Sequence, residues 1–537
     1  MQNKIHRFSE FDDFYSFFKP LTPLGKIAKE KMDLFTDIKT LENEYSLIAD
    51  FLDLIKKNRI LFDRIENHLI KTPLLSFDYG QDFRISDVFL LKKFLSHSKA
   101  VFSLLPKQLR QKLNMKWASM PLLTLLMKGG AGETFYISDS YNPQLKTTRN
   151  EILKIAGKLK NIKKTTLKKL ALQGLDFSTR DFLIIDTKSG YKHYNNRDLF
   201  VEAYDSENIM VKPVFGEKFL KLSAAKEILN KKEKNLENEI IKEIAVLAKK
   251  SIKKLIEISK LIEKTDLLIA KARLAAKFDM IKPILTKSAG IIFKKARFIP
   301  IKLKLKKMKL KYRPLSASFG KRINSLRGSN MGGKTVALKT AAFFQILAQM
   351  GFFVPAQYYQ TQVFKRISFA GNLSDEDING LSGFGLEMQG FIDSGDLKEK
   401  SLIFMDEFAK TTNSNEATAL LTAIIEIFSQ NPNAFMFIST HFSGLPENKN
   451  AACLKMKGFD NAAFKKHFKS AASSGEETSL IEKLIMINKF MRYEIVPDDN
   501  KKRIRDAIKI AKILGMDPKI IKLAKKKMEK KTWLNPN

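Results

Sequence analysis

Cysteine is nearly absent from the sequence, which has one in 537 residues, Cys453. This excludes an intramolecular disulfide and any zinc site built from several cysteines. Long apolar runs are also missing: no stretch of 18 uncharged apolar residues occurs, so no segment is expected to span a membrane. The first residues, MQNKIHRFSEFDDFYSFF, have no uninterrupted apolar core and no small-residue cleavage site, so we expect no signal peptide. These absences predict a cytoplasmic protein.

Acidic residues are few relative to basic ones, 57 against 95, and the formal net charge is +38. Such a charge has two interpretations: binding to nucleic acid, or the lysine-rich codon usage of an AT-rich genome. Lysines cluster at 158–169, 301–313 and 522–531. In the second cluster Lys302, Lys304 and Lys306 alternate with apolar residues, as on the solvent face of a strand. We interpret that cluster as a solvated face rather than a dedicated DNA groove.

The N-terminal half is predicted to be mostly helical. Residues 20–130 are rich in helix formers and punctuated by prolines, whereas 176–217 contains three short apolar runs typical of strands. Residues 218–282 contain no glycine or proline, and apolar residues recur there at three- and four-residue steps. One unbroken helix of that length would reach roughly 90 Å at ~1.5 Å per residue. This pattern predicts a lever or coiled-coil arm, with a broken helical hairpin as the alternative.

The pattern changes after Pro283. Short apolar runs such as SLIFM (401–405) and FMFIS (435–439) alternate with helical stretches such as TALLTAIIEIFSQ (418–430). Strand, loop and helix in alternation predict an α/β layer with a mostly parallel sheet.

Residues 328–335 fit the phosphate-loop pattern G-x-x-x-x-G-K-[ST]. In this pattern glycines turn backbone N–H groups toward phosphate oxygens, Lys334 reaches the outer phosphates, and the Thr335 hydroxyl binds Mg²⁺. The following helix adds its positive N-terminal end. A glycine turn before an ordinary helix is the structural alternative. The preceding RINSLR (322–327) is more polar than the buried strand that usually leads into this loop.

Two further segments support a nucleoside triphosphate site. SLIFMDE ends an apolar run with Asp406 and Glu407, where the first carboxylate would hold the magnesium shell and the second would activate water. FISTH ends another apolar run with His441, which we predict to contact the γ-phosphate. Taken alone, the acidic pair could cap a helix and the histidine could be structural. The acidic pair lies about seventy residues after the loop. Together the segments predict Glu407 and His441 as catalytic and Thr335 and Asp406 as metal ligands.

These segments resemble the MutS family, the ABC-type ATPases of DNA mismatch repair and their relatives. NMGGKT (330–335) is similar to the family's N-M-G-G-K-[ST] loop, GFFVPA (351–356) to G-x-[FY]-V-P-A, and LSGFGLEM (381–388) to the S-T-F-M-x-E-M signature. Weaker similarity covers 21–32, 266–285 and the helix-turn-helix pattern of 505–527, and 132–152 resembles the branch without a mismatch-reading domain. The resemblance implies that ATP is bound by Gly328, Asn330, Met331, Gly332, Gly333, Lys334, Thr335 and Ser382.

The sequence also departs from the family pattern. The helical core is expected to begin near Thr22, which leaves no room for the mismatch-reading and connector domains, and Phe8-Ser9-Glu10 is interpreted as a chance match to the mismatch-reading F-x-E motif. The C-terminal nuclease domain of some relatives is likewise not expected. After Glu407 the family reads roughly G-R-G-T-S-T-x-[DE]-G, whereas this chain reads FAKTTNSNEA, with Ala409, Thr411 and Ala417 in place of glycines. Coupling between two ATP sites is therefore in question.

The resemblance implies an α/β P-loop ATPase domain of ABC/MutS type, preceded by a mostly α-helical core and lever domain. The predicted domains are a helical core (1–175), a clamp-like insertion with long lever helices (176–284), the ATPase domain (285–465) and a C-terminal helical dimerisation segment (466–537).

Three functions are compatible with the sequence. The first is a homodimeric or heterodimeric ATPase that uses ATP and Mg²⁺ to drive a clamp on DNA of unusual shape, not on mismatches. In that dimer Ser382 of one subunit would face the ATP held by Lys334 of the other. The second is an ATP-dependent remodelling or reactivating factor for a protein client. The third, a nucleotide-binding protein that barely hydrolyses, is opposed by Glu407, since inactive sites often lose that carboxylate.

Overall fold

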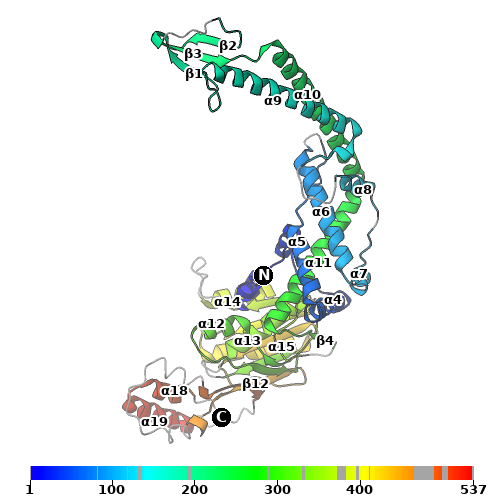
Figure 1. Cartoon of the computed structure of the whole chain (residues 1–537). Coiled ribbons are helices and arrows are strands. Elements are labelled where there is room, and N and C mark those ends of the chain that lie inside the picture. Colours follow the sequence, from blue (N-terminus) through cyan, green and yellow to red (C-terminus); the bar gives the residue numbers. More distant parts are fainter. Residues whose placement is uncertain are drawn as a thin grey trace. The chain divides into compact units, whose positions relative to one another are not determined.

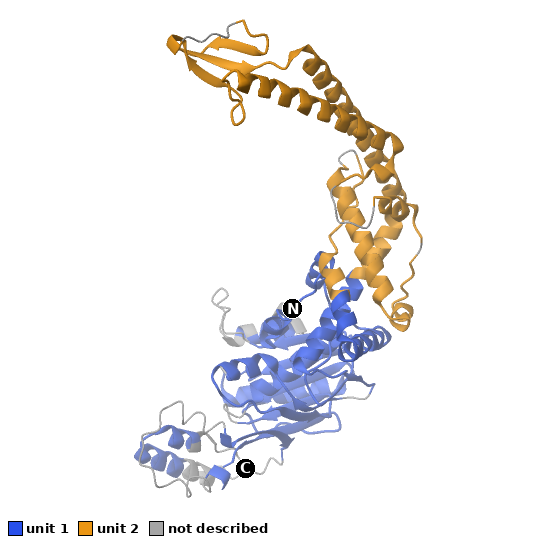
Figure 2. Ribbon diagram, viewed as in Figure 1, with its two compact units in different colours: residues 1–64, 263–537 blue, residues 65–262 orange. Residues whose placement is uncertain are grey.

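A computed structural model describes residues 2–80, 83–117, 119–129, 136–189, 195–287, 290–328, 333–371, 383–394, 398–409, 412–460, 462–464, 489–498 and 506–534. The chain forms two compact units, residues 1–64 with 263–537 (unit 1) and residues 65–262 (unit 2), shown in Figure 2. The sequence-based division into four domains remains a prediction. No helix in the described ranges is long and apolar enough to cross a membrane.

Unit 1 contains a large sheet with helices on it (Figure 1). Its helices are α1 (Gln2–Phe8), α2 (Phe11–Tyr15), α3 (Pro23–Glu30), α4 (Ile38–Lys57), α12 (Ile299–Lys307), α13 (Lys334–Gln349), α14 (Gly383–Ser394), α15 (Ser414–Gln430), α18 (Asp506–Leu514) and α19 (Pro518–Leu534). Its strands are β4 (Ile284–Leu285), β5 (Ile291–Ala296), β6 (Leu315–Phe319), β7 (Ile323–Arg327), β8 (Tyr358–Thr361), β9 (Arg366–Ala370), β10 (Ser401–Asp406), β11 (Ala434–Thr440), β12 (Ala451–Phe459) and β13 (Met491–Pro497). Helices α5 (Arg59–Lys71) and α11 (Ile252–Phe278) contribute residues to both units.

The sheet of unit 1 has the strand order β4-β8-β5-β6-β13-β12-β7-β11-β10-β9. The run β12-β7-β11-β10-β9 is parallel throughout, whereas β12–β13, β5–β6 and β5–β8 pair antiparallel. Strands buried on both faces are continuous apolar runs, and all seven residues of β11 are buried. The mostly parallel α/β layer predicted from the sequence is therefore confirmed.

The N-terminal residues of unit 1 pack on strand β9 and helix α13 through aromatic rings. Phe8 stacks on Phe369 of β9 at 4.0 Å between ring centroids, and Phe14 makes an edge contact with Phe343 of α13. Glu10 binds Lys304 at 2.7 Å and Lys339 at 2.9 Å. Phe8 and Glu10 thus have structural contacts within unit 1, and the interpretation of F-S-E as a chance match remains a prediction.

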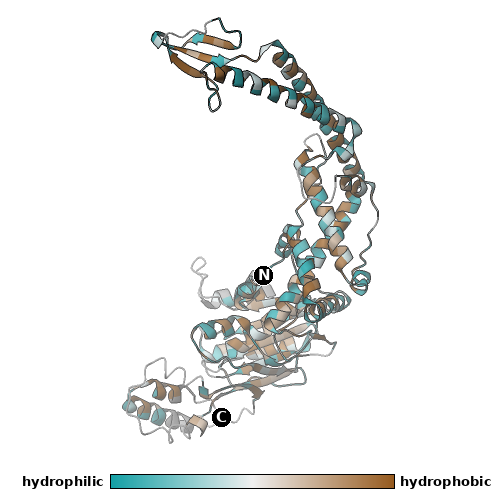
Figure 3. Ribbon diagram, viewed as in Figure 1, coloured by the Kyte–Doolittle hydropathy of each residue, from teal (hydrophilic) through white to brown (hydrophobic). Residues whose placement is uncertain are grey.

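Unit 2 consists of helices and one small sheet. Its elements are α6 (Ile85–Leu104), α7 (Lys107–Lys112), α8 (Pro121–Met127), η1 (Asp139–Tyr141), α9 (Pro143–Leu172), β1 (Leu183–Asp186), η2 (Thr187–Ser189), β2 (Leu199–Ala203), β3 (Asn208–Pro213) and α10 (Gly216–Lys250). The three strands form an antiparallel sheet in the order β1-β3-β2, as the apolar runs predicted. In Figure 3 these strands carry much brown, whereas α9 and α10 alternate teal and brown along their length.

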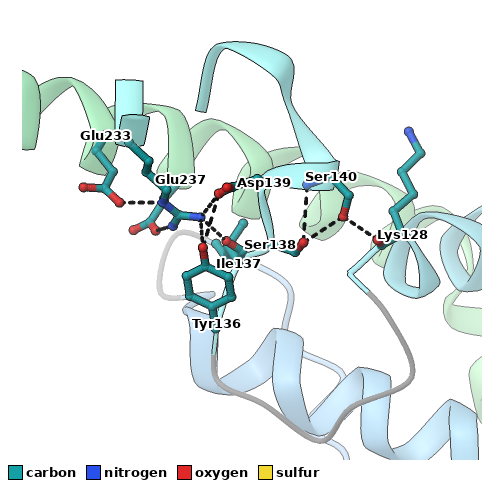
Figure 4. A network of polar contacts seen from close by, with 9 residues as sticks. Lys128, Tyr136, Ile137, Ser138, Asp139, Ser140, Glu233 and Glu237 are labelled. Atoms are coloured by element: carbon teal, nitrogen blue, oxygen red, sulfur yellow. Dashed lines mark hydrogen bonds and ion pairs between the residues drawn. The ribbon is translucent and has the colours of Figure 1, made fainter. Parts of the chain in front are cut away.

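Arg149 forms ion pairs between helices α9 and α10. Arg149 of α9 donates to Glu233 at 2.7 Å and Glu237 at 2.6 Å on α10, and to Asp139 at 2.5 Å (Figure 4). Its guanidinium carbon lies 4.5 Å from the ring centroid of Tyr136. The planar guanidinium presents five donors in a fixed fork, so one side chain can bind three carboxylates and a ring.

Two expectations about secondary structure need revision. Residues 218–282 are not one unbroken helix, because α10 ends at Lys250 and α11 begins at Ile252. Helix α10 packs against α9, and the lever or coiled-coil arm remains a prediction. The strand expected around Lys302, Lys304 and Lys306 is wrong: these residues lie in α12. Pro300 occupies the first turn of α12, where its fixed φ favours a helix start, and the alternating apolar residues are only partly buried.

Candidate nucleotide-binding site

Three neighbouring parallel strands, β7, β11 and β10, end at the same edge of the sheet. Arg327 at the end of β7 is paired in register with Thr440 of β11, and Ser439 of β11 with Asp406 of β10. Ligands in open α/β sheets bind at the carboxyl ends of the strands. The topology therefore brings the phosphate loop, the acidic pair and His441 to one place, as the sequence predicted.

The phosphate loop is described at both ends. Gly328 follows β7, and Gly333 precedes α13 with φ of 87°, a left-handed conformation in which a side chain is strained. A Cβ on Gly333 would also lie 3.0 Å from the Tyr493 ring. Three predicted loop residues, Asn330, Met331 and Gly332, lie outside the described residues.

Lys334 is the buried cation of the site, with 2% of its surface exposed. Its Nζ donates to the Gly328 carbonyl at 2.7 Å and lies 3.7 Å from Glu407 Oε1. Burial lowers the pKa of the ammonium below its ordinary value, opposed by the carboxylates of Glu407 and Asp406. A buried charge of this kind is stabilised by an opposite charge, which phosphate oxygens would supply next to the positive end of α13.

The two predicted metal ligands lie close together. Thr335 donates its hydroxyl to Asp406 Oδ1 at 3.2 Å, and Ser439 also donates to that carboxylate. Mg²⁺ prefers hard oxygen ligands and usually takes only one or two from the protein, the rest coming from water and phosphates. A hydroxyl and a carboxylate at the loop edge fit that ion. No group of three or more histidine, cysteine or acidic side chains suited to a metal occurs among the residues that the structure describes.

Glu407 and His441 form a hydrogen-bonded pair. Glu407 Oε1 lies 2.7 Å from His441 Nε2, and the same nitrogen lies 3.3 Å from Lys334 Nζ. The Glu407 side chain is 17% exposed and that of His441 39%, so both reach water. An oriented carboxylate next to an imidazole can polarise a water molecule and pass on its proton.

Glu387 belongs to the segment LSGFGLEM (381–388), which resembles the family signature, and the sequence alone assigned it no role. In the structure it lies on α14, is 3% exposed, and its Oε2 accepts the Ala409 N–H at 2.8 Å. Ser439 and the Arg327–Asp498 ion pair, at 2.7 Å, were also missed. The only signal for Glu387 was its place in the motif. Ser382, the predicted signature serine, lies outside the described residues.

Comparisons with known proteins agree with this geometry. A family model described as MutS domain V matches residues 325–531. The chain is 24% identical over 469 residues to the Endonuclease MutS2 of Caldicellulosiruptor saccharolyticus, covering 83% of this chain and 57% of the relative. It is 27% identical over 304 residues to that of Carboxydothermus hydrogenoformans, covering 54% and 37%. A DNA mismatch repair protein MutS of Borreliella burgdorferi is 30% identical over 285 residues, covering 49% and 32%. The chain thus spans little more than half the length of these curated relatives, or less.

Proposed function

The chain is a MutS-family protein that carries the family's ATPase domain, and from that premise we propose that it binds and hydrolyses ATP with Mg²⁺ as a dimer. One observation carries the proposal: Lys334 Nζ, Glu407 Oε1 and His441 Nε2 lie within 3.7 Å of one another at the ends of three parallel strands. Relatives named Endonuclease MutS2 and DNA mismatch repair protein MutS support it.

Different residues of the site would bind the phosphates, bind Mg²⁺ and activate the attacking water. Lys334 and the N-terminal end of α13 would hold the phosphates, whose charge replaces Glu407 as the partner of the ammonium. Thr335 and Asp406 would hold Mg²⁺, which when bound neutralises developing charge on the phosphate oxygens. Glu407, released from Lys334, would orient the attacking water and take its proton, with His441 keeping the carboxylate in place.

Dimerisation would complete the site, since the signature segment with Ser382 is expected to face the ATP of the partner subunit. A Ser382-defective subunit mixed with a Lys334-defective subunit leaves one intact composite site in each mixed dimer. Partial recovery of hydrolysis on mixing is the expected result. No recovery, despite subunit exchange shown by mass spectrometry of differently tagged chains, would contradict the shared site.

DNA of unusual shape is the substrate that we propose for the clamp. The lysines of α9 between residues 158 and 169 are exposed on a helix and would contact phosphates without reading bases. At about 0.15 M salt with competitor DNA, we expect preference for a four-way junction over a matched duplex, a change in that preference with ATP, and no preference for a mismatch. The double variant Lys160→Glu/Lys164→Glu should make the affinity for DNA less dependent on salt. The slope of log affinity against log salt concentration should decrease in magnitude by about two. A flat profile across all shapes, unchanged by ATP, would contradict this substrate.

A protein client is the second candidate, and one feature of unit 2 favours it. The face of the three-stranded sheet away from its core exposes Phe182, Ile184, Phe200 and Tyr204 by 43–54%. Residues 176–213 contain seven acidic and five basic side chains, although the whole chain has a net charge of +38. An apolar, net-negative surface does not attract phosphates but suits a protein.

The two candidates are separated by recovering partners of the tagged protein with ATP, with and without nuclease. Recovery of DNA that is lost in Lys160→Glu/Lys164→Glu and kept in Phe200→Glu supports the clamp on DNA. A stoichiometric protein that survives nuclease and is lost only in Phe200→Glu supports the client. Phe200 is half exposed, so the charge placed there leaves the sheet core intact.

A further inference from the structure

The turn that follows β10 has an unusual backbone. Glu407 has φ of 50° and Ala409 has φ of 61°, although neither is glycine. The left-handed conformation costs an L-residue roughly 1–2 kcal/mol, because Cβ approaches the following carbonyl oxygen. Two such residues within three positions persist only when their surroundings hold them.

Two side chains hold this turn by its backbone amides. The Glu407 N–H donates to the Ser439 carbonyl at 3.1 Å and to Ser439 Oγ at 3.0 Å. The Ala409 N–H donates to Glu387 Oε2 at 2.8 Å. Ser439 lies on the neighbouring strand β11, whereas Glu387 comes from α14, a separate element.

Helix α14 is itself fixed against the sheet and the turn. Gly390 lies beside the end of β9, where a Cβ would be 3.7 Å from the Ala370 Cα. Phe391 packs on Phe408 of the turn at 5.9 Å and on Phe428 of α15 at 5.4 Å between ring centroids. Glu387 is 3% exposed, so its hydrogen bond to Ala409 forms where water does not compete.

We propose that Glu387 is a positioning residue for ATP hydrolysis, whose carboxylate holds the Ala409 amide and so keeps Glu407 beside His441 at the end of β10. This rests on the ATPase function proposed above. Hydrogen bonds to an ionised acceptor are roughly twice as strong as neutral ones, which suits a carboxylate that must hold a strained turn. Helix α14 directly follows Ser382 in the sequence, so a shift of that helix would act on the Ala409 amide, two residues after Glu407.

Three variants test the proposal. Glu387→Ala should lower the single-turnover hydrolysis rate by about 10- to 100-fold, because displacement of a catalytic group by ~1 Å costs about that much. Affinity for a fluorescent ATP analogue should stay within about twofold, because Glu387 acts here on the turn after β10, whereas the phosphates would be held by Lys334 and the start of α13. Glu387→Gln keeps an acceptor oxygen and should lose less, roughly 3- to 10-fold. Adding Ala409→Gly to Glu387→Ala should restore part of the rate, since glycine keeps the left-handed turn unaided.

Hydrogen exchange separates this proposal from the ATPase function itself. The Ala409 amide should exchange faster in Glu387→Ala and in Glu387→Gln, while the Glu407 amide, held by Ser439, stays protected. That result is expected even if the wild-type chain hydrolyses no ATP, in which case only the ATPase proposal fails. If the alanine variant does not fold, Glu387→Gln carries the test.

The matched control is Glu426→Gln on α15, an exposed carboxylate that should change neither rate nor exchange. Wild-type hydrolysis and unchanged Ala409 exchange in Glu387→Ala would overturn the positioning role. An equal loss of rate with and without Ala409→Gly would also overturn it, because it would place the effect of Glu387 elsewhere than in the turn.

Discussion

The ion pair between Arg327 and Asp498 offers a test of how the phosphate loop is supported. Arg327 is the last residue of β7, directly before Gly328, and is 8% exposed. Its Nη2 lies 2.7 Å from Asp498 Oδ2, and the Asp498 side chain is 1% exposed. Asp498 follows β13, and its N–H donates to the Cys453 carbonyl of β12 at 3.0 Å. The pair therefore connects the loop strand to the segment before α18.

Removing one partner should be costly. Arg327→Ala or Asp498→Ala leaves a buried charge without its main partner, and such changes destabilise proteins by about 3–5 kcal/mol. Lys455 Nζ lies 3.5 Å from Asp498 Oδ1, but its side chain is 20% exposed and can turn to water when the carboxylate is lost. Replacing both partners, as in Arg327→Met with Asp498→Leu, should return the free energy of unfolding to within ~1 kcal/mol of wild type or above it.

Urea unfolding followed by circular dichroism measures these changes. An unchanged dependence of the free energy on urea would show that each variant exposes the same surface. Asp53→Ala, which breaks an exposed ion pair with Lys57 on α4, serves as the control and should cost less than ~1 kcal/mol. If both buried single variants also cost less than ~1 kcal/mol, the reasoning from burial is refuted.

Three further predictions concern the site and the long helices. Lys334→Ala should abolish binding of a fluorescent ATP analogue, whereas Glu407→Gln should still bind it but hydrolyse ATP at least ~10²-fold more slowly than wild type; hydrolysis at the wild-type rate would contradict the role of Glu407. Ala409→Gly should raise the free energy of unfolding by about 1 kcal/mol in urea, because it removes the left-handed strain, whereas Ala417→Gly, inside α15, should lower it by a similar amount. Leu247→Pro should break α10 at a cost of ~3 kcal/mol or more and remove the ATP dependence of DNA-shape preference while leaving hydrolysis in place.

Much of the architecture was predictable because it depends on local pattern. Continuous apolar runs gave β10 and β11, and the polar ends of those runs gave Asp406, Glu407 and His441. Since parallel strands end at one edge, their meeting with Lys334 followed from strand order alone. The helix-turn-helix expected at 505–527 corresponds to α18 and α19.

Alternation of polar and apolar residues gave a wrong prediction of a strand at residues 301–306. Lys302, Lys304 and Lys306 alternate with apolar residues as in a strand, yet they form α12, one face of which is held by the bond from Lys304 to Glu10. Glu10 precedes Lys304 by 294 residues. A pattern in nine residues contains no information about a partner so distant, and the one local signal for a helix was Pro300 in its first turn.

The polar strand before the phosphate loop is a second case in which the local sequence pattern was misleading. RINSLR looked too polar for a buried strand, yet all five residues of β7 are buried. Ser325 Oγ lies 3.2 Å from Cys453 Sγ on β12, Asn324 donates to the Lys321 carbonyl at 2.6 Å, and Arg327 binds Asp498. Buried polar groups are tolerated when they are hydrogen-bonded. Here the partners are Cys453 on β12, Asp498 after β13 and the backbone of Lys321 just before β7. Polarity in a predicted strand therefore does not exclude burial when the fold supplies partners, and for Ser325 and Arg327 these are Cys453 and Asp498, which lie 128 and 171 residues further along the chain.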